Sequence, residues 1–159
     1  MSRPSRLAAA GATTLALVFG LAAPAAAQAH AGVRAGLSSD PTQFYFGAHV
    51  ETAPLFDRVT FRPNAELGVG NNLTLLAANL EFVYSMSARK QPWRVYLGGG
   101  PALLIFSGDG PRPGNGRGSL EGGFNVVLGA QHKRGLLTEI KVGFANSPRV
   151  KFGVGYAFK

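Results

Sequence analysis

Apolar side chains recur at alternate positions in one segment after another between residues 33 and 158, and charged side chains avoid those positions. Successive side chains of a β-strand point to opposite faces, so a period of two predicts strands. No apolar spacing of three and four residues long enough for a helix follows residue 31. The sequence therefore predicts an all-β chain after its first thirty residues.

Turn-forming residues divide this region into eight segments. Most connections are short, which favours an antiparallel up-and-down arrangement, and the longest connection, 107–118, is rich in glycine and proline. Eight antiparallel strands in this order predict a barrel that closes on itself. The predicted strands are 33–38, 43–51, 59–70, 75–85, 93–106, 119–131, 136–145 and 150–158.

Alternate positions of these segments define two faces of different chemistry. One face carries no charged residue, whereas the other carries five cations and five glutamates, which are all the glutamates of the chain. The three aspartates all lie in connections. The charged face consists of Arg34, Glu51, Arg62, Glu66, Glu81, Arg94, Glu121, Glu139, Lys141 and Lys151.

The uncharged face is predicted to point outward. If it pointed inward, many strand glycines would be exposed to water, where glycine is a poor strand former. If it meets lipid, closure satisfies the backbone and glycines leave room inside a narrow lumen for long charged side chains. Because an eight-stranded barrel is just wide enough for its own side chains, we interpret the ten charges as a structural network that fills the lumen.

The first residues have the pattern of a secretory signal peptide. Arg3 and Arg6 precede an apolar run, and Ala27-Gln28-Ala29 supplies a small-residue cleavage pattern. We expect a signal peptide at 1–29 and one barrel domain at 30–159, with the neighbouring triplet at 29–31 as a rival cleavage site. The chain has no cysteine, which excludes disulfides and thiolate metal sites.

Beyond these patterns, the chain resembles the small outer-membrane barrel families of the outer membrane protein A transmembrane domain and of outer membrane protein X. The resemblance rests on the signal peptide, the eight alternating strands, the YLGGGPALL segment at 96–104 and the closing GVGYAF at 153–158. It implies a transmembrane, porin-like barrel in a Gram-negative cell envelope, with outer-membrane lipid, lipopolysaccharide and the barrel-assembly machinery as partners. The final aromatic, Phe158, is followed by Lys159, which departs from the terminal signal of such families.

The sequence predicts a non-enzymatic monomer without a cofactor, a metal or a nucleic-acid partner. His49 and Glu51 share one face, but no serine completes a His-x-Ser arrangement, and three scattered histidines give no metal-ligand spacing. Arg112 and Arg117, in the longest connection, are candidate lipopolysaccharide contacts. Three alternatives stay open: a soluble periplasmic calycin-like barrel that binds a small apolar ligand, an outer-membrane enzyme that modifies lipid A, and a narrow channel.

Two prolines fit the predicted strands poorly. Pro63 and Pro101 lie inside segments that a closed barrel would pair on both sides, and proline cannot donate to the ladder. A β-bulge is therefore predicted at each proline.

Overall fold

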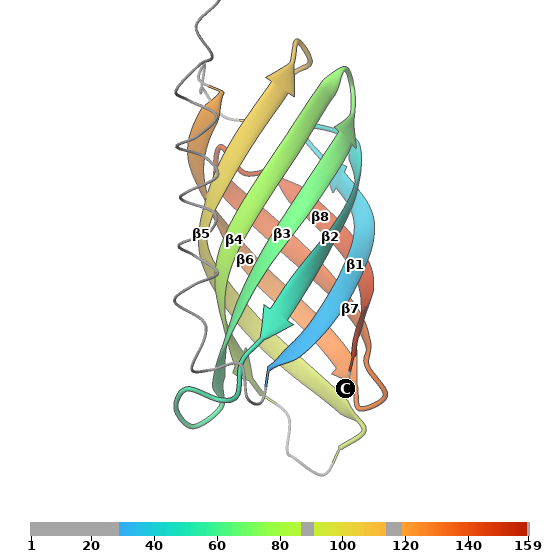
Figure 1. The fold of residues 1–159 in the computed structure, drawn as a ribbon, viewed down its shortest axis with the longest axis vertical. Coiled ribbons are helices and arrows are strands. Elements are labelled where there is room, and N and C mark those ends of the chain that lie inside the picture. The colour runs from blue at the N-terminus through green and yellow to red at the C-terminus, as the bar shows by residue number, and fades with distance from the viewer. Residues whose placement is uncertain (1–28, 87–90, 114–118, 159) are drawn as a thin grey trace, which may run out of the picture.

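The computed structural model describes residues 29–86, 91–113 and 119–158. The predicted signal peptide therefore lies outside the described residues, except for Ala29. Eight strands make up the described chain (Figure 1). They are β1 (His30–Ser39), β2 (Gln43–Glu51), β3 (Val59–Gly70), β4 (Leu73–Ser85), β5 (Trp93–Gly108), β6 (Leu120–His132), β7 (Leu136–Ala145) and β8 (Val150–Ala157).

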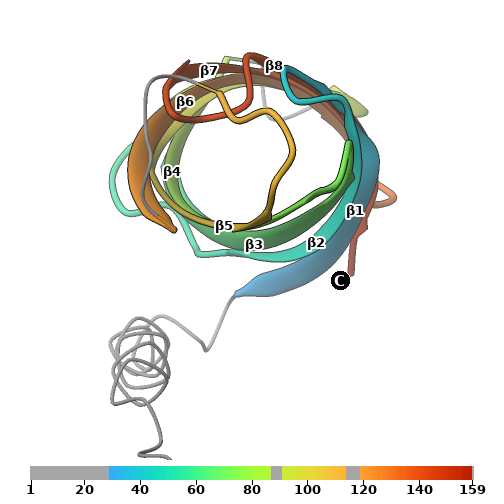
Figure 2. The same ribbon diagram turned by 90° about the horizontal axis from the view of Figure 1, so that it is seen from above.

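Each strand pairs antiparallel with the next one, and β8 pairs with β1. The result is a closed barrel, seen end-on in Figure 2 as a ring of strands. The predicted all-β class and eight-stranded up-and-down barrel are confirmed. Among the described residues, no helix has the length and apolar character needed to cross a membrane.

The predicted strand bounds agree with the structure for β2, β3 and β7, and the other strands differ at their ends. The largest difference is at β1, which begins three residues before the predicted start, at His30, and ends one residue later, at Ser39. β4 and β5 each gain two residues, because their ladder extends to the pair Leu73 and Gly108. Asn71 and Asn72 both have positive φ and form a two-residue hairpin turn, which lets pairing between β3 and β4 start at Gly70 and Leu73. Because of this turn, β4 begins two residues earlier than predicted, and β5, which pairs with β4, ends two residues later than predicted.

The predicted β-bulges at the prolines are wrong. Pro63 faces Leu80 without a change of register between β3 and β4, and the ladder with β2 has already ended at Asn64. Pro101 interrupts pairing between β4 and β5, but two residues on each strand lie between the flanking pairs, so no extra residue is inserted. Proline has no N–H to donate, and each proline lies where the ladder on one side has ended or is interrupted.

Burial separates the two faces as the alternation predicted. Large apolar side chains point out of the barrel, and Phe44, Leu97 and Ile140 each keep about half of their surface exposed, at 50%, 46% and 48%. The charged face points into the lumen, where Arg62, Glu81 and Lys141 are fully buried. This arrangement is the reverse of a water-soluble barrel and suits a hydrocarbon solvent.

Glycines on the lumen wall make room for rings. A Cβ at Gly129 would collide with the ring of Tyr96, and a Cβ at Gly153 would collide with the hydroxyl of Tyr45. The two tyrosines therefore lie flat across strands that offer no side chain at those points. This explains why glycines accumulate on the charged face.

The two ends of the barrel differ in what they carry. The start of β1 and the end of β8 lie at one end, here called the terminal end, together with the connections 52–58 and 133–135 and the described residues 86 and 91–92 between β4 and β5. The opposite end carries the connections 40–42, 71–72 and 146–149 and the described residues 109–113 and 119 between β5 and β6.

Candidate functional site

A network of buried ion pairs crosses the middle of the lumen. Glu139 accepts hydrogen bonds from Arg34 at 2.5 Å, from Arg62 at 3.2 Å and from the Tyr96 hydroxyl at 3.0 Å. The Arg62 guanidinium also lies over the Tyr96 ring, 4.6 Å from its centre. Glu139 is therefore the acceptor that joins β1, β3, β5 and β7.

Two lysines connect the remaining carboxylates of this network. Lys141 Nζ lies 2.7 Å from Glu66 Oε1 and 2.7 Å from Glu81 Oε1. Lys151 Nζ lies 2.7 Å from the second oxygen of Glu66, and Arg62 reaches Glu81 at 3.3 Å. The network, defined as Arg34, Arg62, Glu66, Glu81, Glu139, Lys141 and Lys151, brings together seven of the ten residues assigned from sequence to the lumen.

Four cations and three carboxylates make up this network, and no side chain in it is more than 3% exposed. Burying charges is costly unless they are paired, so such a network forms only where each carboxylate meets several donors. An amide chain extends the polar layer, because Asn125 donates to Asn79 and Asn79 donates to Asn64. The network and the three asparagines are at most 6% exposed and together occupy the middle of the lumen.

An apolar cluster fills the lumen nearer the opposite end. Its members lie on the inner faces of β4 and β5 and are at most 6% exposed. Sorting by alternation missed them, although both segments read as continuous apolar runs, which is how strands buried on both faces appear. The cluster consists of Leu73, Leu75, Ala77, Ala102, Leu104 and Phe106.

The opposite end holds the remaining predicted residues. Glu121 accepts a hydrogen bond from Asn146 at 3.3 Å. Arg112 donates to the carbonyl of Gly108 and lies over the Phe106 ring at 5.5 Å. Arg112 thus lies over Phe106, a member of the apolar cluster. Its contact with lipopolysaccharide stays a prediction. Arg117 lies outside the described residues.

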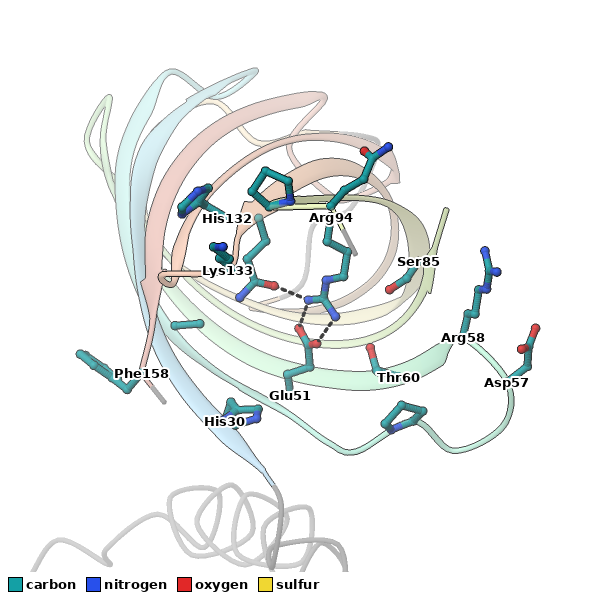
Figure 3. Close-up of a pocket in the computed structure, with 15 residues that line it drawn as sticks. His30, Glu51, Asp57, Arg58, Thr60, Ser85, Arg94, His132, Lys133 and Phe158 are labelled. Atoms are coloured by element: carbon teal, nitrogen blue, oxygen red, sulfur yellow. Dashed lines mark hydrogen bonds and ion pairs between the residues drawn. The ribbon is translucent and has the colours of Figure 1, made fainter. Parts of the chain in front are cut away.

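The terminal end carries the last pair of predicted lumen charges. Arg94 Nη1 lies 2.7 Å from Glu51 Oε1, and the same guanidinium donates to the side chain of Gln131. Figure 3 shows Arg94 and Glu51 facing each other across the mouth of the barrel. A cavity of about 380 Å³ opens here, lined by these residues together with Thr60, His132 and others. A second cavity, deeper in the lumen beside Tyr45 and Lys151, measures about 10 Å³, room for one water.

The three histidines of the chain lie at or near the terminal end. His30 and His132 line the cavity at the terminal end, and His49 is buried near the end of β2. Among the described residues, no three His, Asp or Glu side chains are close enough to hold a metal ion.

A closed eight-stranded barrel with an uncharged outer face and a charged lumen has the architecture of the small outer-membrane β-barrels. No family model matches the chain, and no curated protein matches it. Several solved structures share its fold, three of which are compared with the chain below. Neisserial surface protein A is 13% identical, with a TM-score of 0.58, and the match covers 82% of this chain and 95% of that chain. The N-terminal β-barrel domain of Pseudomonas aeruginosa OprF is 12% identical, with a TM-score of 0.57, and the match covers 82% of this chain and 96% of that chain. The outer membrane enzyme PagL is 12% identical, with a TM-score of 0.56, and the match covers 82% of this chain and 99% of that chain.

At these identities the likeness establishes the fold. The chain has the closed eight-stranded fold of these outer-membrane barrels, which is the fold that the sequence resemblance predicted. The three proteins include an enzyme, so the shared fold alone does not assign an activity.

Proposed function

We propose that this protein is an integral outer-membrane barrel without enzymatic activity, with a role in envelope structure or surface interaction. The proposal depends on one observation: the central network and the apolar cluster fill the lumen. The uncharged face of the barrel points outward. A barrel filled in this way serves as a stable membrane-embedded scaffold, and its connections are what it offers to partners.

The proposed orientation places the terminal end in the periplasm. Aromatic residues then form two belts, as is typical of membrane barrels. Tyr84, Trp93 and Tyr156 lie toward the terminal end, while Phe44 and Phe152 lie toward the opposite end, and all five are exposed on the outer surface. We expect lipid to surround the barrel, lipopolysaccharide to surround its outer rim, the barrel-assembly machinery to insert it, and the folded protein to be a monomer.

The position of the histidines argues against a histidine-based lipid A enzyme. All three lie on strand ends at or near the terminal end, whereas lipid A occupies the outer leaflet in the proposed orientation. His49 is also only 3% exposed inside the lumen, so it cannot contact a lipid. A general base must lie within hydrogen-bond reach of its substrate.

The other two alternatives meet physical objections in the lumen. A calycin-like carrier needs an apolar interior cavity, but here seven ionisable side chains cross the lumen. A channel needs a continuous water path, and beyond the network the second cavity has room for a single water.

Cell fractionation combined with heat-modifiable migration in detergent gels tests the proposal. We expect the protein in the outer-membrane fraction, resistant to carbonate extraction, with faster migration before boiling. Release as a folded protein in water would contradict the membrane assignment. An altered lipid A profile on deletion, or discrete conductance steps in planar bilayers, would contradict the non-enzymatic or the non-conducting part.

A further inference from the structure

The cavity at the terminal end is the larger of the two cavities described above. It measures about 380 Å³ and is partly open to solvent, and the ion pair between Arg94 and Glu51 lies in its lining (Figure 3). We propose that it is a binding site for a small organic anion bearing a carboxylate or phosphate group. The site itself follows from geometry and charge, and only its exposure to the periplasm rests on the proposed function.

The charge of the lining favours an anion. Three cations, Arg58, Arg94 and Lys133, line the cavity with two acids, Glu51 and Asp57. Behind the cavity, the central network adds a further excess of one cation over its carboxylates. A cleft lined by low-dielectric walls concentrates such a potential and attracts ligands of the opposite sign.

Arg94 is the group best placed to contact the ligand. Its side chain is 30% exposed, whereas Glu51 beside it is 10% exposed. Glu51 and Gln131 hold the guanidinium in one orientation, so little conformational freedom is lost on binding. A guanidinium binds carboxylate and phosphate through paired hydrogen bonds, and an incoming anion would share it with Glu51.

Thr60 supplies an independent sign of a ligand. The residue lines the cavity and is 4% exposed, and within the described part of the chain its hydroxyl has no hydrogen-bond partner. Leaving a buried hydroxyl without a partner costs free energy, and such groups often mark a position that a ligand or water fills. In the proposed complex, a small shift of the side chains that cover this hydroxyl lets it donate to an anion held by Arg94.

Binding is measured with inorganic phosphate and with succinate as probes, using the full-length mature protein folded in a nonionic detergent. Trp93 is the only tryptophan of the chain, and its ring lies 4.9 Å from that of His132, which lines the cavity. Equilibrium dialysis of labelled phosphate gives the affinity, and Trp93 fluorescence, through the contact with His132, provides a second readout. Glucose and free arginine serve as neutral and cationic comparisons.

Two substitutions should move affinity in opposite directions. Arg94→Gln removes the guanidinium, and we expect phosphate affinity to fall about tenfold or more. Glu51→Gln removes the competing carboxylate, and we expect affinity to rise several-fold. Thr60→Val keeps the shape but not the hydroxyl, and we expect affinity to fall about threefold without loss of folding.

Arg149→Gln is the matched control, because it removes a cation at the opposite end and should leave binding unchanged. The proposal is wrong if neither probe binds saturably, or if all four variants bind phosphate equally, which would mark the cavity as a water-filled mouth. Heat-modifiable migration of each variant shows separately whether the barrel is intact, so loss of the site and failure of the proposed function are distinguishable.

Discussion

The central network and the apolar cluster fill the same lumen by opposite means. The network uses four cations and three carboxylates that must meet one another with suitable geometry. The cluster uses six apolar side chains that need shape but no partner. Both leave little space, yet loss of one member should have different consequences in the two regions, because an unpaired charge disturbs its neighbours and a missing methyl group leaves a void.

The largest effect is expected in the central network. Glu139→Gln leaves four cations with two carboxylates and replaces one of the two acceptor oxygens shared by Arg34, Arg62 and Tyr96 with an NH2 donor. Because breaking a buried pair leaves an uncompensated charge, we expect the free energy of unfolding to fall by about 3 to 5 kcal/mol. Urea titration in lipid vesicles or detergent micelles measures it.

Adding Arg34→Met to Glu139→Gln provides the control for this prediction. The double variant has three cations and two carboxylates, the same excess as the natural network, so part of the lost stability should return. If the double variant loses the sum of the free energies of unfolding lost by the two single variants, the network stabilises the barrel through separate contacts and not through its balance of charge.

A smaller effect is expected in the apolar cluster. Leu104→Ala should lower the free energy of unfolding by about 3 kcal/mol, since Leu104 is fully buried and its removal leaves a cavity. The neighbouring Leu103→Ala is the matched control, because Leu103 is 44% exposed on the outer face, where lipid can fill the space. We expect it to cost about 1 kcal/mol. Equal losses at the two positions would contradict the assigned faces.

The smallest effect is expected at the ion pair between Arg149 and Asp40, at the opposite end of the barrel. The two groups lie 3.3 Å apart, but their side chains are 76% and 51% exposed. Solvent and salt screen such a pair, so Arg149→Gln should change the free energy of unfolding by about 0.5 kcal/mol or less in the same titration. A loss approaching that of Glu139→Gln would show that burial does not set the strength of ion pairs in this barrel.

Alternation along the chain was sufficient to predict the barrel and the direction in which each strand faces. The bounds of β2, β3 and β7 and the inward position of residues such as Arg62 and Glu81 follow from it directly. A pattern with a period of two carries this information because a one-residue slip would turn every side chain to the other face.

Partnerships across the lumen could not be predicted in the same way. Lys141 meets Glu66, 75 residues away in the chain, because barrel closure brings β7 opposite β3. The apolar cluster was missed because Leu75 and Leu104 lie in runs that are apolar on both faces, where alternation gives no signal. The bulges predicted at Pro63 and Pro101 were wrong because the ladder tolerates gaps there without a change of register.

The central claim is that lipid, and not water, contacts the uncharged face. It is tested by quenching of single tryptophans with brominated lipid chains, in a Trp93→Phe background that removes the native one. Leu103→Trp places the probe on the outer face, and Phe106→Trp places it in the buried apolar cluster of the same strand. The account predicts strong quenching at position 103 and little at 106. Quenching at 106 with none at 103 would contradict it.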